Sequence, residues 1–111
     1  MKKEHTYEVL VTWTGNTGEG TKNYKSYQRS HSIKWNNKPE ILASSDPVFL
    51  GDTSKWNPEE MLLSSLSSCH MLWYLHLCAD NKINVCEYKD IPLGVLEIQK
   101  DGAGQFSKVL L

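Results

Sequence analysis

The stretch NPEEMLLSSLSSCHMLWYLHLCA, residues 57–79, decides the fold of this chain. Asparagine is a preferred helix N-cap, and Pro58 suits the first helical position because the missing N–H would have no partner there anyway. Glu59 and Glu60 place negative charge at the positive end of the helix dipole. Good helix formers follow until ADNK interrupts them after residue 79. The pattern predicts one long helix.

The predicted helix carries no fixed charge from Met61 to Ala79, which raises the question of a membrane span. Four serines and two histidines interrupt the run, and acidic residues stand at its entrance without a basic cluster. These features argue against a span, and we expect no membrane contact. A helix that is apolar on most sides is a buried helix. We therefore expect a sheet or a second subunit to cover it.

The segments around the helix alternate apolar and polar residues, as strands do. Residues 36–56 are different: they contain Pro39, Pro47, Gly51 and several Ser and Asp residues, and they predict an unusually long loop with a functional or interface role. The 111 residues suit a single α+β domain with antiparallel strands. The strands are expected at residues 7–13, within 22–35, and at 83–88, 93–99 and 106–111.

The charge balance and the cysteines restrict the function. The net charge is −1 and the basic residues are scattered, so no basic stripe indicates binding to nucleic acid. The N-terminus lacks the unbroken apolar segment of a secretory signal. Three cysteines form neither a C-x-x-C pair nor a secreted disulfide framework. We expect a cytoplasmic protein with reduced thiols.

The spacing of the helix cysteines and histidines excludes two kinds of site. Cys69 and Cys78 lie about 13.5 Å apart along the axis, too far for a disulfide, so Cys78 is predicted to be a small buried residue. Cys69 and His76 lie about 10 Å apart, too far to share one ion. We expect no metal site and no bound cofactor. Cys86, on a predicted strand, is interpreted as a core or surface thiol.

Cys69 is the candidate reactive thiol, and a reactive thiol needs a cationic neighbour. The helix dipole does not supply one, because its effect fades within the first turn and Cys69 lies twelve residues beyond the N-cap. The cation must come from outside the helix. Arg29, the one arginine of the chain, and Lys34 are the candidates; five positions apart, they point to opposite faces of one strand.

The helix motif, preceded by GDTSKW and by YQRSHSIKW, resembles the OsmC/Ohr family of thiol-dependent organic hydroperoxide reductases. The resemblance runs along the whole chain. It implies a strongly curved antiparallel sheet around a long central buried helix, in an intertwined homodimer. It also implies that a helix thiolate attacks the peroxide, becomes a sulfenic acid, and is resolved by a second cysteine and then by a dithiol reductant.

Carried over to this sequence, the resemblance makes Cys69 the peroxide-reactive cysteine. Glu59 becomes the glutamate whose partner arginine steadies the thiolate. Arg29 is our choice for that arginine, with Lys34 as the alternative. Leu66 and Trp73, one turn on either side of Cys69, are the candidates for contact with the organic group of the peroxide.

The position of Glu59 adds a geometric argument. Glu59 and Cys69 are about 15 Å apart along the helix, so one arginine reaches both only if two subunits form a composite site. A homodimer is therefore expected, provided that Glu59 has the family role.

The chain departs from the family at its end, where relatives continue into a further helix that bears the resolving cysteine. Residues 1–111 are therefore expected to form a single OsmC-like domain without the C-terminal helix and last strand. The alternative function is a non-catalytic or truncated OsmC-like dimer that binds a small ligand or senses oxidants.

Overall fold

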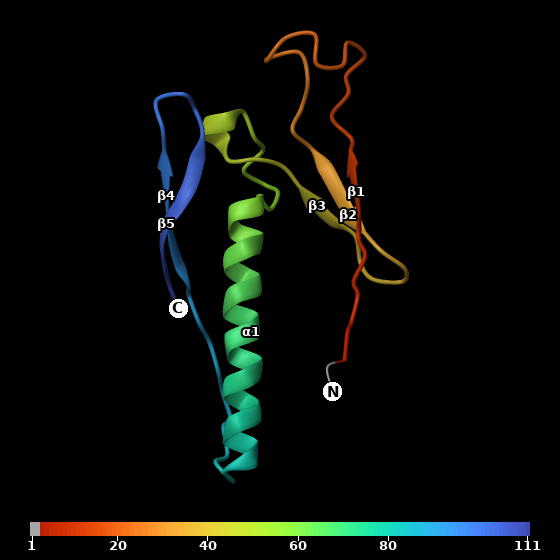
Figure 1. The fold of residues 1–111 in the computed structure, drawn as a ribbon. Helices are drawn as coiled ribbons and strands as arrows, with labels where there is room; N and C mark the ends of the chain where they lie inside the picture. Colours follow the sequence, from red (N-terminus) through yellow and green to blue (C-terminus); the bar gives the residue numbers. More distant parts are fainter. Residues whose placement is uncertain (1–2) are drawn as a thin grey trace. The chain divides into compact units, whose positions relative to one another are not determined.

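The computed structural model describes residues 3–111. The chain divides into two compact units, Met1–Pro58 and Glu59–Leu111. Each unit contains its own small antiparallel sheet, and the long helix runs through the second unit (Figure 1).

The first unit is built on a three-stranded antiparallel sheet in the order β1-β2-β3. Trp13 pairs with His31, and His31 in turn pairs with Ala43, so these three residues lie side by side across the sheet. Ala43 is fully buried there, and Ser30, just before β2, and Ser44, just after β3, are also buried. The strands are β1 (Leu10–Trp13), β2 (His31–Lys34) and β3 (Ile41–Ala43).

The segment after β3 folds back onto the sheet. A short 3-10 helix, η1 (Pro47–Phe49), begins where the Asp46 carboxylate accepts a hydrogen bond from the Val48 amide at 2.9 Å. Trp56 then bridges Ala43, and its carbonyl accepts a hydrogen bond from the Ser44 amide at 2.8 Å. These contacts hold residues 44–56 against the end of β3.

The second unit contains all of α1 (Pro58–Asp80) except its first residue. Lys82 takes a positive φ of 58°, and the Ile83 amide donates to the Cys78 carbonyl at 2.8 Å, so the chain reverses at the end of the helix. Residues 83–92 then run back along α1 (Figure 1). Two contacts fasten this segment: the Ser67 hydroxyl donates to the Asp90 carboxylate at 2.5 Å, and the Tyr74 and Tyr88 rings lie 5.8 Å apart.

The hairpin of β4 (Leu93–Ile98) and β5 (Gly104–Leu110) completes this unit. Gly94 of β4 lies close to the Leu63 side chain of the helix. A Cβ atom at this position would lie 2.9 Å from the Leu63 side chain and 2.7 Å from the Phe106 ring. Glycine therefore allows the close approach of strand and helix.

The predicted α+β class, its antiparallel pairing and the helix position are confirmed. Three expectations for the strands need correction. Residues 83–88 form no strand; the Tyr88 ring and the Asp90 carboxylate just after them contact α1. The expected loop at 36–56 contains β3 and η1, and the first strand is shorter than residues 7–13.

The helix is less covered within this chain than its composition suggested. Cys78 is the buried residue of α1. Six large apolar side chains along the helix are 41% to 62% exposed: Leu62, Leu66, Leu72, Trp73, Tyr74 and Leu77. A covering second subunit stays a prediction. No helix within residues 3–111 has the length and apolar character needed to cross a bilayer.

Candidate functional site

Cys69 lies in the middle of α1 with an exposed, free thiol. The helix positions it because the first turn is well specified by Pro58, Glu59 and Glu60. The regular helix then carries Cys69 to the face that also presents Leu66 and Trp73, three residues before it and four after it. Solvent therefore reaches the sulfur and both apolar neighbours in this chain.

The Trp73 side chain is 62% exposed and forms one wall of an open apolar hollow of about 260 Å³, which Leu72 and His76 complete. The Trp73 and His76 rings meet edge to face at 5.7 Å. His76 also lies 3.5 Å from the Asp80 carboxylate. Trp73 lines this hollow, whereas Leu66 lies outside its lining. Contact of either side chain with the organic group of a peroxide stays a prediction.

Glu59 lies in the first turn of α1 and is half-buried. No hydrogen bond or ion pair joins its carboxylate to another residue within 3–111. The helical rise separates it from Cys69 by about 15 Å along the axis. The two residues therefore do not form one compact site on a single helix.

The other two cysteines differ from Cys69 in their surroundings. Cys78 is 6% exposed, as expected for a small buried residue. Its hydrogen bond with Tyr74 raises the pKa of the Tyr74 hydroxyl above the usual value, and the charge that Cys78 would carry as a thiolate acts in the same direction. Cys86 is exposed on the extended segment after α1.

The two candidate cations lie in the first unit and have different partners. The Lys34 ammonium donates to the carbonyls of Asn36 (2.8 Å) and Lys38, so it closes the turn after β2. Arg29 precedes β2, so the argument from opposite faces of one strand does not apply to it. Arg29 and Cys69 belong to different units, and their pairing stays a prediction.

The Arg29 guanidinium is held firmly by its own loop. It donates to the Tyr27 and Tyr24 carbonyls at 2.6 Å each. Its central carbon also lies 3.9 Å from the centre of the Tyr27 ring and 4.4 Å from the centre of the Tyr24 ring. Both cation–π contacts are within the range in which such contacts are attractive.

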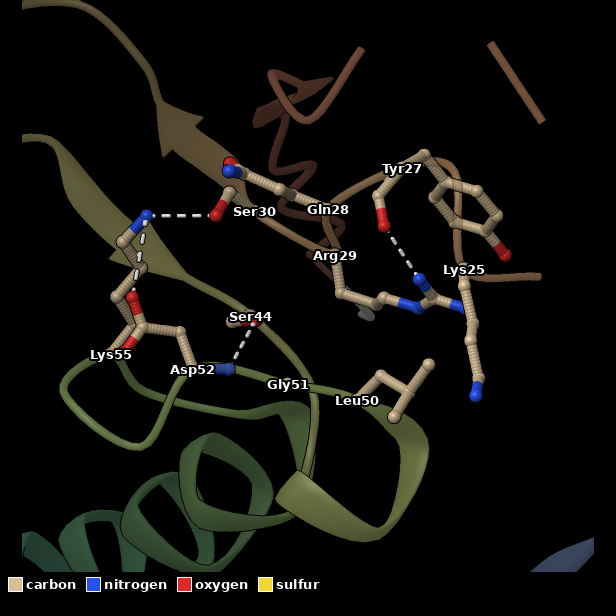
Figure 2. A pocket seen from close by; sticks show the side chains of 10 residues that line it. All are labelled: Lys25, Tyr27, Gln28, Arg29, Ser30, Ser44, Leu50, Gly51, Asp52 and Lys55. Carbon is tan, nitrogen blue, oxygen red and sulfur yellow. Dashed lines mark hydrogen bonds and ion pairs between the residues drawn. The ribbon is translucent and has the colours of Figure 1, made fainter. Parts of the chain in front are cut away.

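Arg29 is one wall of a polar pocket of about 370 Å³ in the first unit (Figure 2). The Lys55 ammonium donates to the Ser30 hydroxyl at 2.8 Å and lies 4.0 Å from the Asp52 carboxylate. The Asp52 amide donates to the Ser44 hydroxyl at 3.0 Å. The lining comprises Lys25, Tyr27, Gln28, Arg29, Ser30, Ser44, Leu50, Gly51, Asp52 and Lys55.

The sequence reasoning missed this pocket. Its lining comes from three segments, and no single segment shows a binding motif. The concentration of Lys25, Arg29 and aromatic residues in KNYKSYQR was the one local signal, and it was interpreted as part of a strand or hairpin. Metal binding has no comparable site: within residues 3–111, no three His, Cys, Asp or Glu side chains group closely enough to hold an ion.

Comparisons with known proteins agree with the fold. The family model described as "OsmC-like protein" matches residues 51–110. The solved structure of an OsmC-like protein of unknown function from Vibrio cholerae O1 biovar eltor is similar, with a TM-score of 0.80 and 32% sequence identity. The alignment covers 96% of this chain and 71% of that chain. No curated protein matches the sequence.

Proposed function

The chain belongs to the OsmC-like protein family, and we propose that it reduces organic hydroperoxides through the thiol of Cys69. The observation that supports this most directly is the setting of Cys69 on α1. Its thiol is free and exposed, and it lies between two apolar residues, Leu66 and Trp73, on the helix that follows the N-P-E motif. Of the three cysteines, Cys69 alone combines exposure with a central place on this helix.

The proposed reaction begins with attack of the Cys69 thiolate on the distal oxygen of the peroxide. The O–O bond breaks, the second oxygen leaves with the organic group and takes up a proton to become an alcohol, and the sulfur is oxidised to a sulfenic acid. A dithiol then attacks the sulfenic sulfur and releases water. Its second thiol displaces Cys69, which regains its thiol while the reductant becomes a disulfide. One peroxide and one dithiol are consumed in each cycle.

Arg29 is proposed to steady the thiolate, because a guanidinium stays charged when it is buried and donates hydrogen bonds in a fixed plane. Glu59 is proposed to orient that guanidinium. Since Glu59 and Cys69 are about 15 Å apart on one helix, the composite site needs Glu59 of the partner subunit in a homodimer. The exposed apolar side chains of α1 support this proposal, because a second subunit would cover them.

The organic group of the peroxide is proposed to lie against the apolar surface formed by Leu66 and Trp73. The hollow of about 260 Å³ beside Trp73 has room for a small substituent. The three free cysteines and the need for a dithiol reductant suit the reducing cytoplasm, where we propose that the protein works.

The direct test is the consumption of tert-butyl hydroperoxide with dithiothreitol as reductant. The Cys69→Ser variant is expected to lose the activity, and Cys78→Ser and Cys86→Ser are expected to keep most of it. Equal activity of Cys69→Ser and the unaltered protein would refute the proposal. Loss of activity in Cys78→Ser with an unchanged circular dichroism spectrum would refute the assignment to Cys69.

A further inference from the structure

The polar pocket of the first unit carries an excess of positive charge. Lys25, Arg29 and Lys55 contribute three cations, and Asp52 contributes one carboxylate. That carboxylate already accepts hydrogen bonds from the hydroxyl and amide of Ser54, at 2.7 and 2.9 Å, and these bonds lower the pKa of Asp52 below its usual value. Because Asp52 stays ionised and lies near Lys55, the charge available to a ligand comes mainly from Lys25 and Arg29.

Two buried hydroxyl groups add hydrogen-bond donors to the same pocket. Ser30 is 7% exposed and Ser44 is 1% exposed. The Ser30 oxygen accepts a hydrogen bond from Lys55, and the Ser44 oxygen accepts one from the Asp52 amide. A hydroxyl that accepts still has its own proton to donate. The pocket therefore offers donors from buried groups as well as from charged ones.

Arg29 is ready to bind without rearrangement. Two of its five N–H groups donate to backbone carbonyls, and two tyrosine rings hold the plane of the guanidinium. Three N–H groups remain for a ligand. The Lys25 ammonium, on the same side of the pocket in Figure 2, has no hydrogen bond or ion pair within residues 3–111. A fixed fork beside a free ammonium suits an anion with two or more oxygen atoms.

We propose that this pocket binds a small organic oxyanion, a carboxylate or a phosphate monoester. Its volume of about 370 Å³ exceeds the space that an isolated carboxylate or phosphate fills, and it lies within the range of small-molecule sites. Tyr27 and Leu50 supply apolar walls for the organic part of the ligand. The site shares Arg29 with the proposed peroxidase site, but it goes beyond that function because its other nine lining residues have no role there and do not include Cys69.

The test is a titration of the full chain with acetate and, separately, with methyl phosphate. Sodium chloride at matched ionic strength is the reference, and the amide signals of Gly51 and Asp52 in ¹⁵N–¹H NMR spectra are the readout. The site predicts saturable shifts with a dissociation constant in the millimolar range or below for at least one of the two anions. Saturation by acetate alone identifies a carboxylate site, and saturation by methyl phosphate alone identifies a phosphate site.

Three variants make the test specific. Lys25→Met removes a free ammonium from an exposed loop and is expected to weaken binding by about tenfold or more. Lys38→Met removes the same charge outside the pocket and is expected to leave the affinity unchanged. Cys69→Ser is also expected to leave it unchanged, which separates this site from the peroxidase proposal. The absence of saturation for both anions, or equal weakening by Lys25→Met and Lys38→Met, would overturn the proposal.

Discussion

Gly51 lies where the chain has no room for a side chain. The Gly51→Ala substitution therefore tests whether the stability of the first unit depends on this close backbone contact. A Cβ atom at this position would lie 1.6 Å from the Ser45 carbonyl oxygen and 2.3 Å from its carbon. Both atoms belong to the backbone, so no rotation of a side chain relieves the clash. The gap must open to at least 3.0 Å, which requires the backbone itself to move.

The surrounding hydrogen bonds resist that movement. The Asp46 carbonyl accepts from the Phe49 amide at 2.8 Å and from the Gly51 amide at 3.1 Å, and the Ser45 hydroxyl donates to the Phe49 carbonyl at 3.2 Å. Overpacking in a protein interior costs about 1–3 kcal/mol. Because backbone and hydrogen bonds must give way here, we expect Gly51→Ala to lower the free energy of unfolding by about 3 kcal/mol.

The assay is urea denaturation followed by circular dichroism at one fixed protein concentration, because an oligomer would make stability depend on concentration. Gly104→Ala is the matched control. Its Cβ would meet the Leu96 side chain at 3.4 Å, an ordinary contact, so we expect a change of less than about 1 kcal/mol. Equal stability of the two variants would refute the described path of the chain between Ser45 and Gly51.

Two further predictions concern the second unit. Asp90→Ala and Ser67→Ala each remove the bond that fastens residues 83–92 to α1, so each is expected to lower the free energy of unfolding by about 1 kcal/mol. The double variant should lose little more than either single one, and fully additive losses in urea denaturation would show that the two groups act independently. Cys78→Ala is expected to bring the raised pKa of Tyr74 down toward its usual value in an ultraviolet titration, and Cys86→Ala is expected to leave it unchanged. A Tyr74 pKa that stays raised in Cys78→Ala would contradict the role of this hydrogen bond.

The helix could be predicted from the sequence almost to the residue. Its start depends on local chemistry, because the Asn-Pro pair at residues 57–58 and two glutamates all signal a helix start within one turn. Its expected end at about residue 79 differs by one from the observed end at Asp80. Local signals of this kind need no knowledge of the rest of the fold.

The strands were harder to predict, because pairing depends on distant residues. Residues 83–88 alternate as a strand would, but the contacts of Tyr88 and Asp90 are with α1. In contrast, β3 is three residues long and lies in a segment rich in Pro and Ser, so its own sequence is a weak signal. Its pairing with β2 is what makes it a strand.

The polar pocket was hard to predict for the same reason, because its lining residues are brought together by strand pairing. The pairing of His31 with Ala43 brings the preceding Ser30 close to the following Ser44, although they are distant in the sequence. The Ala43 bridge to Trp56 then brings Lys55 to Ser30. No spacing rule in the sequence encodes these contacts. The importance of Cys69 could be predicted, because its helix and its motif lie in one continuous stretch.

The measurement that tests the central proposal most directly is the oxidation state of each cysteine after one equivalent of tert-butyl hydroperoxide, without reductant. Mass spectrometry of trapped peptides identifies the oxidised residue, and chromatography measures the alcohol. We predict a sulfenic acid on Cys69 and one alcohol per oxidised thiol, with Cys78 and Cys86 still reduced. Equal oxidation of the two exposed cysteines, Cys69 and Cys86, or a reduced Cys69 beside unconsumed peroxide, would contradict the proposal.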